Sequence, residues 1–145
     1  WSSDVCSSDL IQDIPHGYVF GTDLQQSSWQ HAIVVEGVFD ALSINGLAVL
    51  HAEINDAQVR LIRSLGKEIT VVPDQDEAGM KLVDRAVELG WAVSIPNWPT
   101  DIKDANDAVM RFGRAGTLLS IFEARNTSKV KIEIAKKNLL RKING

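Results

Sequence analysis

Short apolar runs alternate with amphipathic stretches along most of the chain from residue 32 onward. The apolar runs are rich in branched side chains, and each is short enough for a strand that is buried on both faces. Their alternation with helical patterns predicts repeated β-α units, and therefore an α/β fold with a mostly parallel sheet of about four strands flanked by helices. The predicted strands are residues 32–35, 48–51, 69–72 and 91–95.

Apolar positions recur at helical spacing in the stretches between and after these runs. Four of the stretches end directly before a glycine, the residue that most readily adopts the left-handed conformation that stops a helix. We expect the basic amphipathic helix at the C-terminal end to lie outside the core. The predicted helices are residues 38–45, 56–65, 77–89, 104–112, 117–124 and 129–143.

The first thirty-one residues are less regular than the rest of the chain. Residues 18–20 predict an extra strand and residues 25–31 a polar connection, whereas residues 1–10 are rich in Ser and Asp without periodicity. We expect four parts along the chain. They are a non-native or disordered leader at 1–10, the remnant of a preceding subdomain at 11–31, the main α/β domain at 32–113, and a C-terminal helical extension or linker at 114–145.

Charge is distributed unevenly. The formal net charge is −4, but residues 129–145 hold five lysines, one arginine and one glutamate. That segment therefore carries +5, which leaves −9 for residues 1–128. The α/β region is acidic, and the basic C-terminal helix either contacts a nucleic-acid backbone or is simply a solvated helix face.

The composition argues against a disulfide scaffold, a zinc finger and a membrane protein. Cys6 is the only cysteine, and with three histidines beside it no zinc-ligand spacing occurs. No apolar run approaches the roughly 18 residues of a membrane span, and the N-terminal residues lack the regions of a signal peptide. We expect a cytoplasmic protein without a membrane partner.

Two carboxylates follow the third predicted strand. Asp74 and Asp76 stand where this strand ends and a helix begins, and Gly79 permits close packing of that helix. In an open α/β sheet, this edge is where ligands bind. The two aspartates could converge on one Mg²⁺ ion, which retains waters and also binds substrate phosphates. The alternative is that both aspartates only cap the helix.

Glu36 holds the equivalent position after the first predicted strand, with Gly37 at the turn into the next helix. Two such strand ends on neighbouring strands could face one pocket. Glu36 would then be a third metal ligand or a general acid/base, with its pKa raised by the other carboxylates. Asp40, one helical turn further on, is expected to be structural.

These motifs resemble those of the Toprim domain, which primases, topoisomerases and some nucleases share. The resemblance rests on Glu36-Gly37-x-x-Asp40 after one strand and on Asp74-x-Asp76-x-Ala-Gly79 after a later strand. Residues 36–42 are closer to the primase branch than to topoisomerases or the small RNA-maturation nucleases. A third segment, residues 103–107, resembles the Lys-Asp-x-Asn/Asp-Asp/Glu segment of phage primase-helicases and bacterial primases. Its alternative interpretation is an ordinary N-capped helix start.

The resemblance implies a Toprim, Rossmann-like catalytic domain at residues 32–113. It assigns metal binding and catalysis to the strand-end acids, substrate contact to the third segment, and shaping of the site to residues at the helix starts. The metal-binding and catalytic residues are Glu36, Asp74 and Asp76, with Asp104 as a further metal ligand. The substrate-contacting residues are Lys103 and Asp107, and the residues that shape the site are Gly37, Asp40 and Gly79.

The activity that the resemblance implies is that of a DNA primase. Such an enzyme makes RNA primers on a single-stranded DNA template from NTPs, with Mg²⁺ as cofactor and Mn²⁺ as a substitute. A replicative helicase, in cis or in trans, would be its partner in a bacterial cell, whether the gene is bacterial or from a phage. Primases of this family also carry a basic template-binding subdomain ahead of the Toprim fold, of which residues 11–31 would be the remnant. Without that subdomain, the resemblance implies a part that can bind metal and yet be inactive in synthesis on its own.

Three other interpretations remain open. A metal-dependent nuclease or topoisomerase-like enzyme would use the same acids, although the one tyrosine, Tyr18, lies outside any recognisable strand-passage context. A non-catalytic DNA-binding module would keep the Toprim shape without its chemistry. A response-regulator-like or nucleotide-binding domain would use Asp74 and Asp76 as caps, but no glycine-rich phosphate loop is present.

Overall fold

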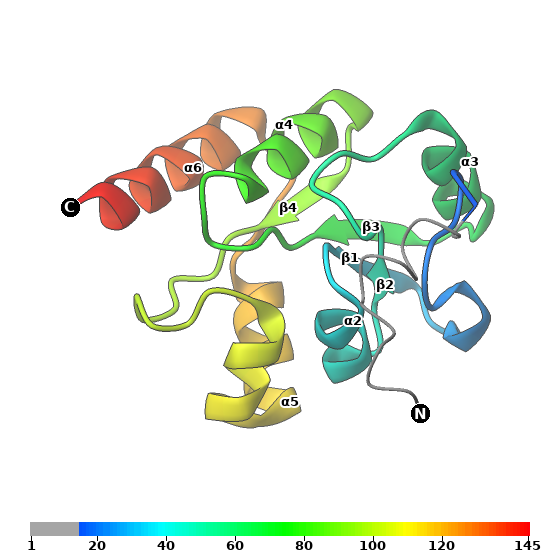
Figure 1. The fold of residues 1–145 in the computed structure, drawn as a ribbon, viewed down its shortest axis with the longest axis horizontal. Coiled ribbons are helices and arrows are strands. Elements are labelled where there is room, and N and C mark those ends of the chain that lie inside the picture. The colour runs from blue at the N-terminus through cyan, green and yellow to red at the C-terminus, as the bar shows by residue number, and fades with distance from the viewer. Residues whose placement is uncertain (1–14) are drawn as a thin grey trace, which may run out of the picture.

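The structure is a computed structural model, and it describes residues 15–145. A five-stranded sheet forms its centre, in the order β2-β1-β3-β4-β5, with helices on both faces (Figure 1). Strands β1 to β4 pair in parallel, and β5 is antiparallel to β4. The strands are β1 (His31–Val35), β2 (Leu47–Ala48), β3 (Glu68–Val71), β4 (Ala92–Ser94) and β5 (Arg125–Asn126). The predicted α/β fold with a mostly parallel sheet is confirmed.

The helices form two layers, one on each face of the sheet (Figure 1). Helices α3, α4 and α6 cover one face, and α2 and α5 cover the other. A short 3-10 helix, η1 (Thr22–Leu24), precedes β1. The helices are α2 (Val38–Ile44), α3 (Asp56–Ser64), α4 (Gly79–Leu89), α5 (Ala105–Glu123) and α6 (Lys129–Asn144).

The strands supply both cores because successive side chains point to opposite faces. In β1, Ala32 and Val34 join the core beneath α3, α4 and α6, whereas Ile33 and Val35 join the core beneath α2 and α5. All four side chains are buried, as expected for a strand covered on both faces. Packing in the two cores therefore fixes the position and direction of the strand ends that carry the candidate acids.

Three features of this architecture differ from the predictions made from the sequence. The fifth strand was not predicted, because Arg125 and Asn126 show neither apolar character nor alternation. The predicted helices 104–112 and 117–124 are parts of α5, which is broken at Gly113, where φ is 78° and ψ 166°. Residues 18–20 form no strand, and Phe20 makes a single antiparallel bridge to Ala48 instead.

The C-terminal helix α6 belongs to the molecule's core, so the expectation that it lies outside is wrong. Ile132 and Leu139, two turns apart on one face, are buried in the core shared with α3 and α4. Lys136, on the flank of the same face, pairs with Asp84 of α4. The basic residues that dominate this helix in the sequence concealed its short apolar stripe.

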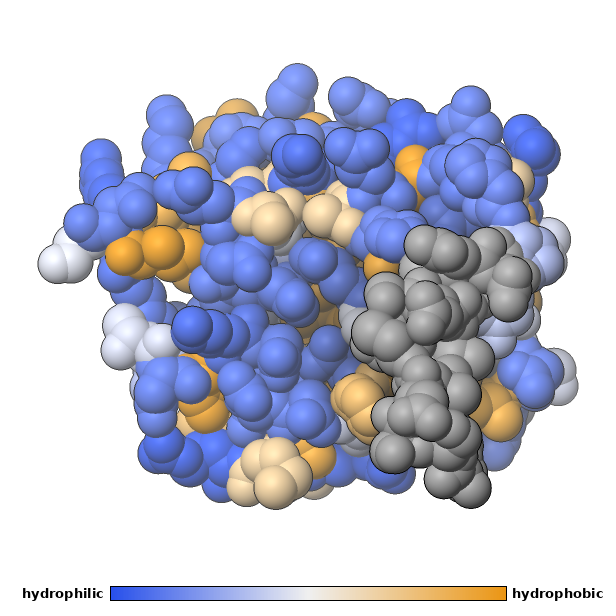
Figure 2. Space-filling view, viewed as in Figure 1, coloured by the Kyte–Doolittle hydropathy of each residue, from blue (hydrophilic) through white to orange (hydrophobic). Residues whose placement is uncertain are grey.

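The visible surface is mainly hydrophilic, with hydrophobic side chains in separate groups (Figure 2). Such scattered apolar exposure is ordinary for a folded domain. Within residues 15–145, no helix has the length and apolar character needed to cross a bilayer. The predicted leader at residues 1–10 lies outside the described residues.

Candidate active site at the acidic edge of the sheet

Glu36, Asp74 and Asp76 lie at the carboxyl edge of the sheet, and together they are called the acidic centre below. Glu36 follows β1, and both aspartates follow β3. These strands are parallel neighbours, with Val34 paired to Val71, so their ends emerge side by side. Glu36 Oε1 accepts a hydrogen bond of 3.4 Å from the backbone N–H of Asp74. The ends of β1 and β3 therefore lie side by side, with Glu36 hydrogen-bonded to the loop that carries Asp74.

Gln75 fixes the loop that carries the two aspartates. Its side chain is buried, and its Nε2 donates to the carbonyl of Pro96 at 2.6 Å. Its backbone N–H donates to the carbonyl of Lys103, also at 2.6 Å. These two bonds anchor the loop between the partly buried Asp74 and the exposed Asp76. This role was not predicted from the sequence, although the position of Gln75 between two candidate ligands was the available signal.

Gly79 allows α4 to begin directly against this loop. A Cβ atom at Gly79 would lie 2.1 Å from the carbonyl oxygen of Asp74, so no larger residue fits without moving the backbone. The N–H of Gly79 donates to Asp76 Oδ1 at 2.7 Å. Asp76 thus holds the start of α4 with one carboxylate oxygen, which is the capping contact considered above, while its exposed side chain faces solvent.

Asp40 joins the two helices on the other face of the sheet. Its buried Oδ1 accepts a hydrogen bond of 2.8 Å from the N–H of Asn106, at the start of α5. Ser43 strengthens the connection by donating to Asn106 Oδ1 at 2.7 Å. A Cβ at Gly37 would come within 2.8 Å of Asp40 Oδ2, so glycine makes room for this carboxylate. These contacts support the structural role expected for Asp40.

Residues 103–107 form an N-capped helix start. Asp104 caps α5 by accepting from the N–H of Asp107 at 2.8 Å, and Asp107 Oδ2 accepts from the N–H of Lys103 at 3.3 Å. The charge of the Asp104 carboxyl helps to raise the pKa values of both Asp40 and Asp74. The Lys103 side chain is exposed. Asp104 therefore lies beside the acidic centre, whereas the observed contacts of Asp107 are those of a helix start.

The gathering of these acids changes their protonation. The pKa of Asp74 is raised to about 8. Burial is the largest cause, and the charges of Glu36, Asp40, Asp104 and Asp76 add to it. Burial likewise raises the pKa of Asp40 to about 6, with Asp104 and Asp107 adding to the effect against the lowering hydrogen bond from Asn106. The pKa of Glu36 is raised mainly by burial. Negative charge at this edge is therefore poorly compensated.

A divalent cation suits this edge by its donor chemistry. None of the ion pairs found in residues 15–145 involves the acidic centre, Asp40 or Asp104. Within the same residues, no three acidic, histidine or cysteine side chains are gathered as a ready ligand set for one ion. Mg²⁺ does not require such a cage, because it usually keeps several waters and is held by one or two carboxylates. The residues present therefore fit Mg²⁺.

The fold and these motifs together define the class of protein. The family of Toprim-like proteins matches residues 33–109, which is more than half of the chain, and the chain belongs to this family. The match includes Glu36, Asp74, Asp76 and residues 103–107. The family expected from the sequence motifs is thus confirmed.

Among solved structures, the chain is similar to the RNA polymerase domain of Mycobacterium tuberculosis primase DnaG. The TM-score is 0.65 and the sequence identity 22%. The similarity covers 83% of this chain and 44% of that chain, so the chain spans less than half of its structural neighbour. At this identity the comparison establishes a shared fold. No curated protein sequence matches the chain.

Proposed function

We propose that this chain is the Toprim catalytic part of a DNA primase, which carries out Mg²⁺-dependent nucleotidyl transfer to make RNA primers on single-stranded DNA. The observation that carries the proposal is the convergence of Glu36 and Asp74 across neighbouring parallel strands, with uncompensated negative charge around them. The similarity in fold to the RNA polymerase domain of a primase supports it. The partners proposed are a single-stranded DNA template, NTPs and a replicative helicase, in the bacterial cytoplasm.

In this proposal, Glu36, Asp74 and Asp76 hold Mg²⁺, with Asp104 as a further ligand and Mn²⁺ as a substitute. Bound there, the cation would neutralise triphosphate charge and lower the pKa of the attacking 3′-hydroxyl. Lys103 contacts substrate phosphate from the loop to which Gln75 is hydrogen-bonded. Asp107 orders that loop through the backbone of Lys103.

The remaining residues orient the acids. Gln75 anchors the loop that carries Asp74 and Asp76, and Gly79 lets α4 start against this loop without displacing Asp74. Asp40 fixes α2 to the start of α5, which places Asp104 beside the centre. Preorganised charges of this kind need no rearrangement during the reaction, which is why their geometry matters for rate.

A product assay tests the proposal. The chain, fused to the template-binding subdomain of a primase, is incubated with labelled single-stranded DNA, the four NTPs and Mg²⁺, and the products are separated by length. We expect NTP-dependent synthesis of short RNA that is lost in Glu36→Gln and Asp76→Asn. The charge-matched control Glu123→Gln changes an exposed acid at the end of α5 and should retain the activity of the unmodified chain.

The other outcomes of the assay contradict the proposal in different ways. NTP-independent shortening of the labelled DNA that requires Glu36 would make the chain a nuclease. Synthesis that survives both substitutions would place the catalytic residues elsewhere. Absence of synthesis and of shortening, with DNA binding retained, would favour the non-catalytic DNA-binding module.

A further inference from the structure

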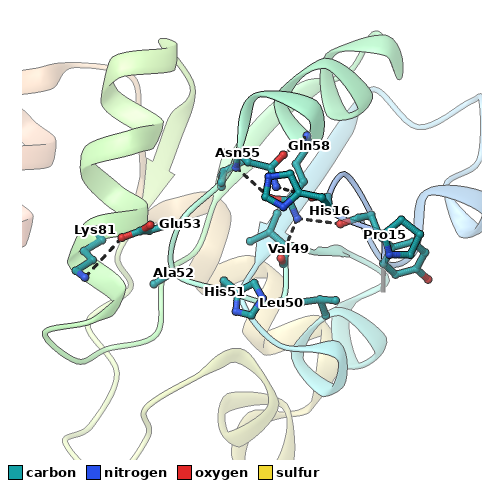
Figure 3. A pocket seen from close by; sticks show the side chains of 12 residues that line it. Pro15, His16, Val49, Leu50, His51, Ala52, Glu53, Asn55, Gln58 and Lys81 are labelled. Atoms are coloured by element: carbon teal, nitrogen blue, oxygen red, sulfur yellow. Dashed lines mark hydrogen bonds and ion pairs between the residues drawn. The ribbon is translucent and has the colours of Figure 1, made fainter. Parts of the chain in front are cut away.

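A pocket of about 660 Å³ lies beyond the end of the edge strand β2 (Figure 3). One wall is the segment after β2, including Leu50 and His51, and another is the start of α3 at Asn55. The N-terminal segment contributes Tyr18 to the lining, and Figure 3 shows His16 of this segment on one side and Lys81 of α4 on the opposite side. The volume is typical of a site for a small organic ligand.

The pocket shares a wall with the acidic centre. The N–H of Leu50, which lines the pocket, donates to the carbonyl of Glu36 at 2.8 Å. Leu50 has a left-handed φ of 69°, unusual for a branched residue, and this turn sends the chain away from the sheet around the pocket. On the α4 side, Lys81 lies just after the turn that begins with Asp76 and Gly79. The pocket is therefore joined to the acidic centre through the backbone at Glu36 and through the start of α4.

The chemistry of the pocket differs from that of the acidic centre. Its charged side chains include the exposed pair Glu53 and Lys81, whose charges cancel at a separation of 3.7 Å. Its rings are those of Tyr18, His16 and His51, and Figure 3 shows the two imidazoles at separate places around the pocket. Planar rings provide stacking surfaces for a nucleobase, which every base can use through its π-face.

The walls are held in place by buried polar contacts. Gln58 is buried, and its Nε2 donates to the carbonyls of Tyr18 at 2.8 Å and Val49 at 2.9 Å. Asn55 caps α3 and donates to the carbonyl of His16 at 2.5 Å. These bonds tie the N-terminal segment to β2 and α3, so the pocket is formed before a ligand arrives. A preformed site loses little entropy on binding.

We propose that this pocket binds the base and ribose of the nucleoside triphosphate whose phosphates lie at the acidic centre, with Tyr18 and His51 as stacking residues. The inference rests on the proposed function, because the position of the triphosphate follows from the acids. It adds a nucleoside site to that function. The neutral, ring-bearing pocket receives the nucleoside, and the acidic edge receives the cation and phosphates.

Binding of two probes separates the two sites. The affinities of ATP and of inorganic tripolyphosphate are measured by calorimetry in Mg²⁺ for the unmodified chain, Tyr18→Ala and His51→Ala. Tripolyphosphate carries the phosphates without the nucleoside. We expect each substitution to weaken ATP binding about tenfold, the order expected for loss of one stacking contact, and to leave tripolyphosphate binding unchanged.

Two controls accompany these variants. His51→Phe keeps a planar ring and should retain most of the ATP affinity. Lys137→Ala changes an exposed residue of α6 that does not line the pocket, and both affinities should match those of the unmodified chain. Thermal unfolding of each variant shows whether the fold is retained. Gln58→Leu removes the bonds to Tyr18 and Val49, so it should weaken ATP binding and leave tripolyphosphate binding unchanged.

The outcomes distinguish this inference from the proposed function. If ATP does not bind, or binds the alanine variants as it binds the unmodified chain, the nucleoside site is overturned. If tripolyphosphate fails to bind the unmodified chain while ATP binding still depends on His51, the acidic-centre function fails and the nucleoside site stands. A dependence on His51 seen only with single-stranded DNA would overturn the assignment to a mononucleotide.

Discussion

Asp74 is the residue at the acidic edge whose ionised form is most strongly disfavoured. Its pKa is raised by burial and by four other carboxylates, so its ionised form is disfavoured in the folded chain unless a cation is present. Replacing Asp74 with asparagine would remove the carboxylate charge and its repulsion by the neighbouring acids, while keeping a side chain of similar shape. The unfolding free energy of the chain should therefore depend on pH chiefly through Asp74.

The unfolding free energy of the cation-free chain should fall as pH rises. Folding raises the pKa of Asp74 from its ordinary 3.8 to about 8, so the folded chain binds a proton over that range that the unfolded chain has released. The resulting stability is fully present below about pH 4 and is lost as pH rises toward 8. Asp40, whose pKa is raised to about 6, acts in the same direction.

Urea unfolding in EDTA between pH 5 and pH 8 measures this effect. The unmodified chain should lose stability over the interval, and Asp74→Asn should lose less. Added Mg²⁺ should restore more stability at pH 8 than at pH 5, because the ionised carboxylates bind it. Equal pH dependence in the two proteins would contradict the assigned environment of Asp74.

At the scale of elements, α6 is the clearest case in which tertiary structure decides what local pattern leaves open. Its apolar contacts with the α3 and α4 side of the sheet are few, but they are fully buried. A helix that contributes to the main core cannot separate from the domain without exposing that core to water. Its stability is therefore coupled to that of the whole fold.

Ile132→Ala should destabilise the chain by about 2–5 kcal/mol, the range for truncating a buried branched side chain. Ile132 is 2% exposed. The control is Val130→Ala on the same helix, where the side chain is 69% exposed and the change should stay within about 0.5 kcal/mol. Chemical denaturation of both variants provides the comparison. Similar small effects at both positions would mean that α6 is not part of the core.

The order of strands and helices was predictable because buried parallel strands and amphipathic helices leave strong periodic patterns. The helix ends followed from glycine, although α2 ends with Asn45 in the left-handed conformation rather than with Gly46. The two-residue strand β5 was not predictable, since its pairing with β4 depends on tertiary contact and not on its own sequence. Edge elements of this length carry no periodic pattern.

The site was predictable where chemistry and topology coincide. Glu36, Asp74 and Asp76 could be found because carboxylates at the ends of parallel strands share one edge. Gln75 and Gln58 were missed because their roles consist of hydrogen bonds to backbone groups that are distant in sequence. The pocket at His51 was missed for the same reason, since it forms only when the N-terminal segment packs beside β2 and α3.

At the scale of the whole molecule, charge is separated between two regions. The segment at residues 129–145 carries +5, and the remaining −9 includes the acids at the sheet edge. An acidic edge alone would repel both nucleotide and template, so a role in nucleotidyl transfer requires bound cations. Cation binding by the acidic centre is thus the claim on which the rest of the account depends.

Calorimetric titration with Mg²⁺ and Mn²⁺ tests this claim directly. The unmodified chain is compared with the double variant Asp74→Ala, Asp76→Ala and with a charge-matched control, Asp23→Ala, Glu123→Ala, at exposed positions elsewhere. We expect saturable binding in the unmodified chain and the control, and its loss in the Asp74, Asp76 variant. Indistinguishable titrations of all three proteins would contradict it, and the aspartates would then be helix caps and surface charge.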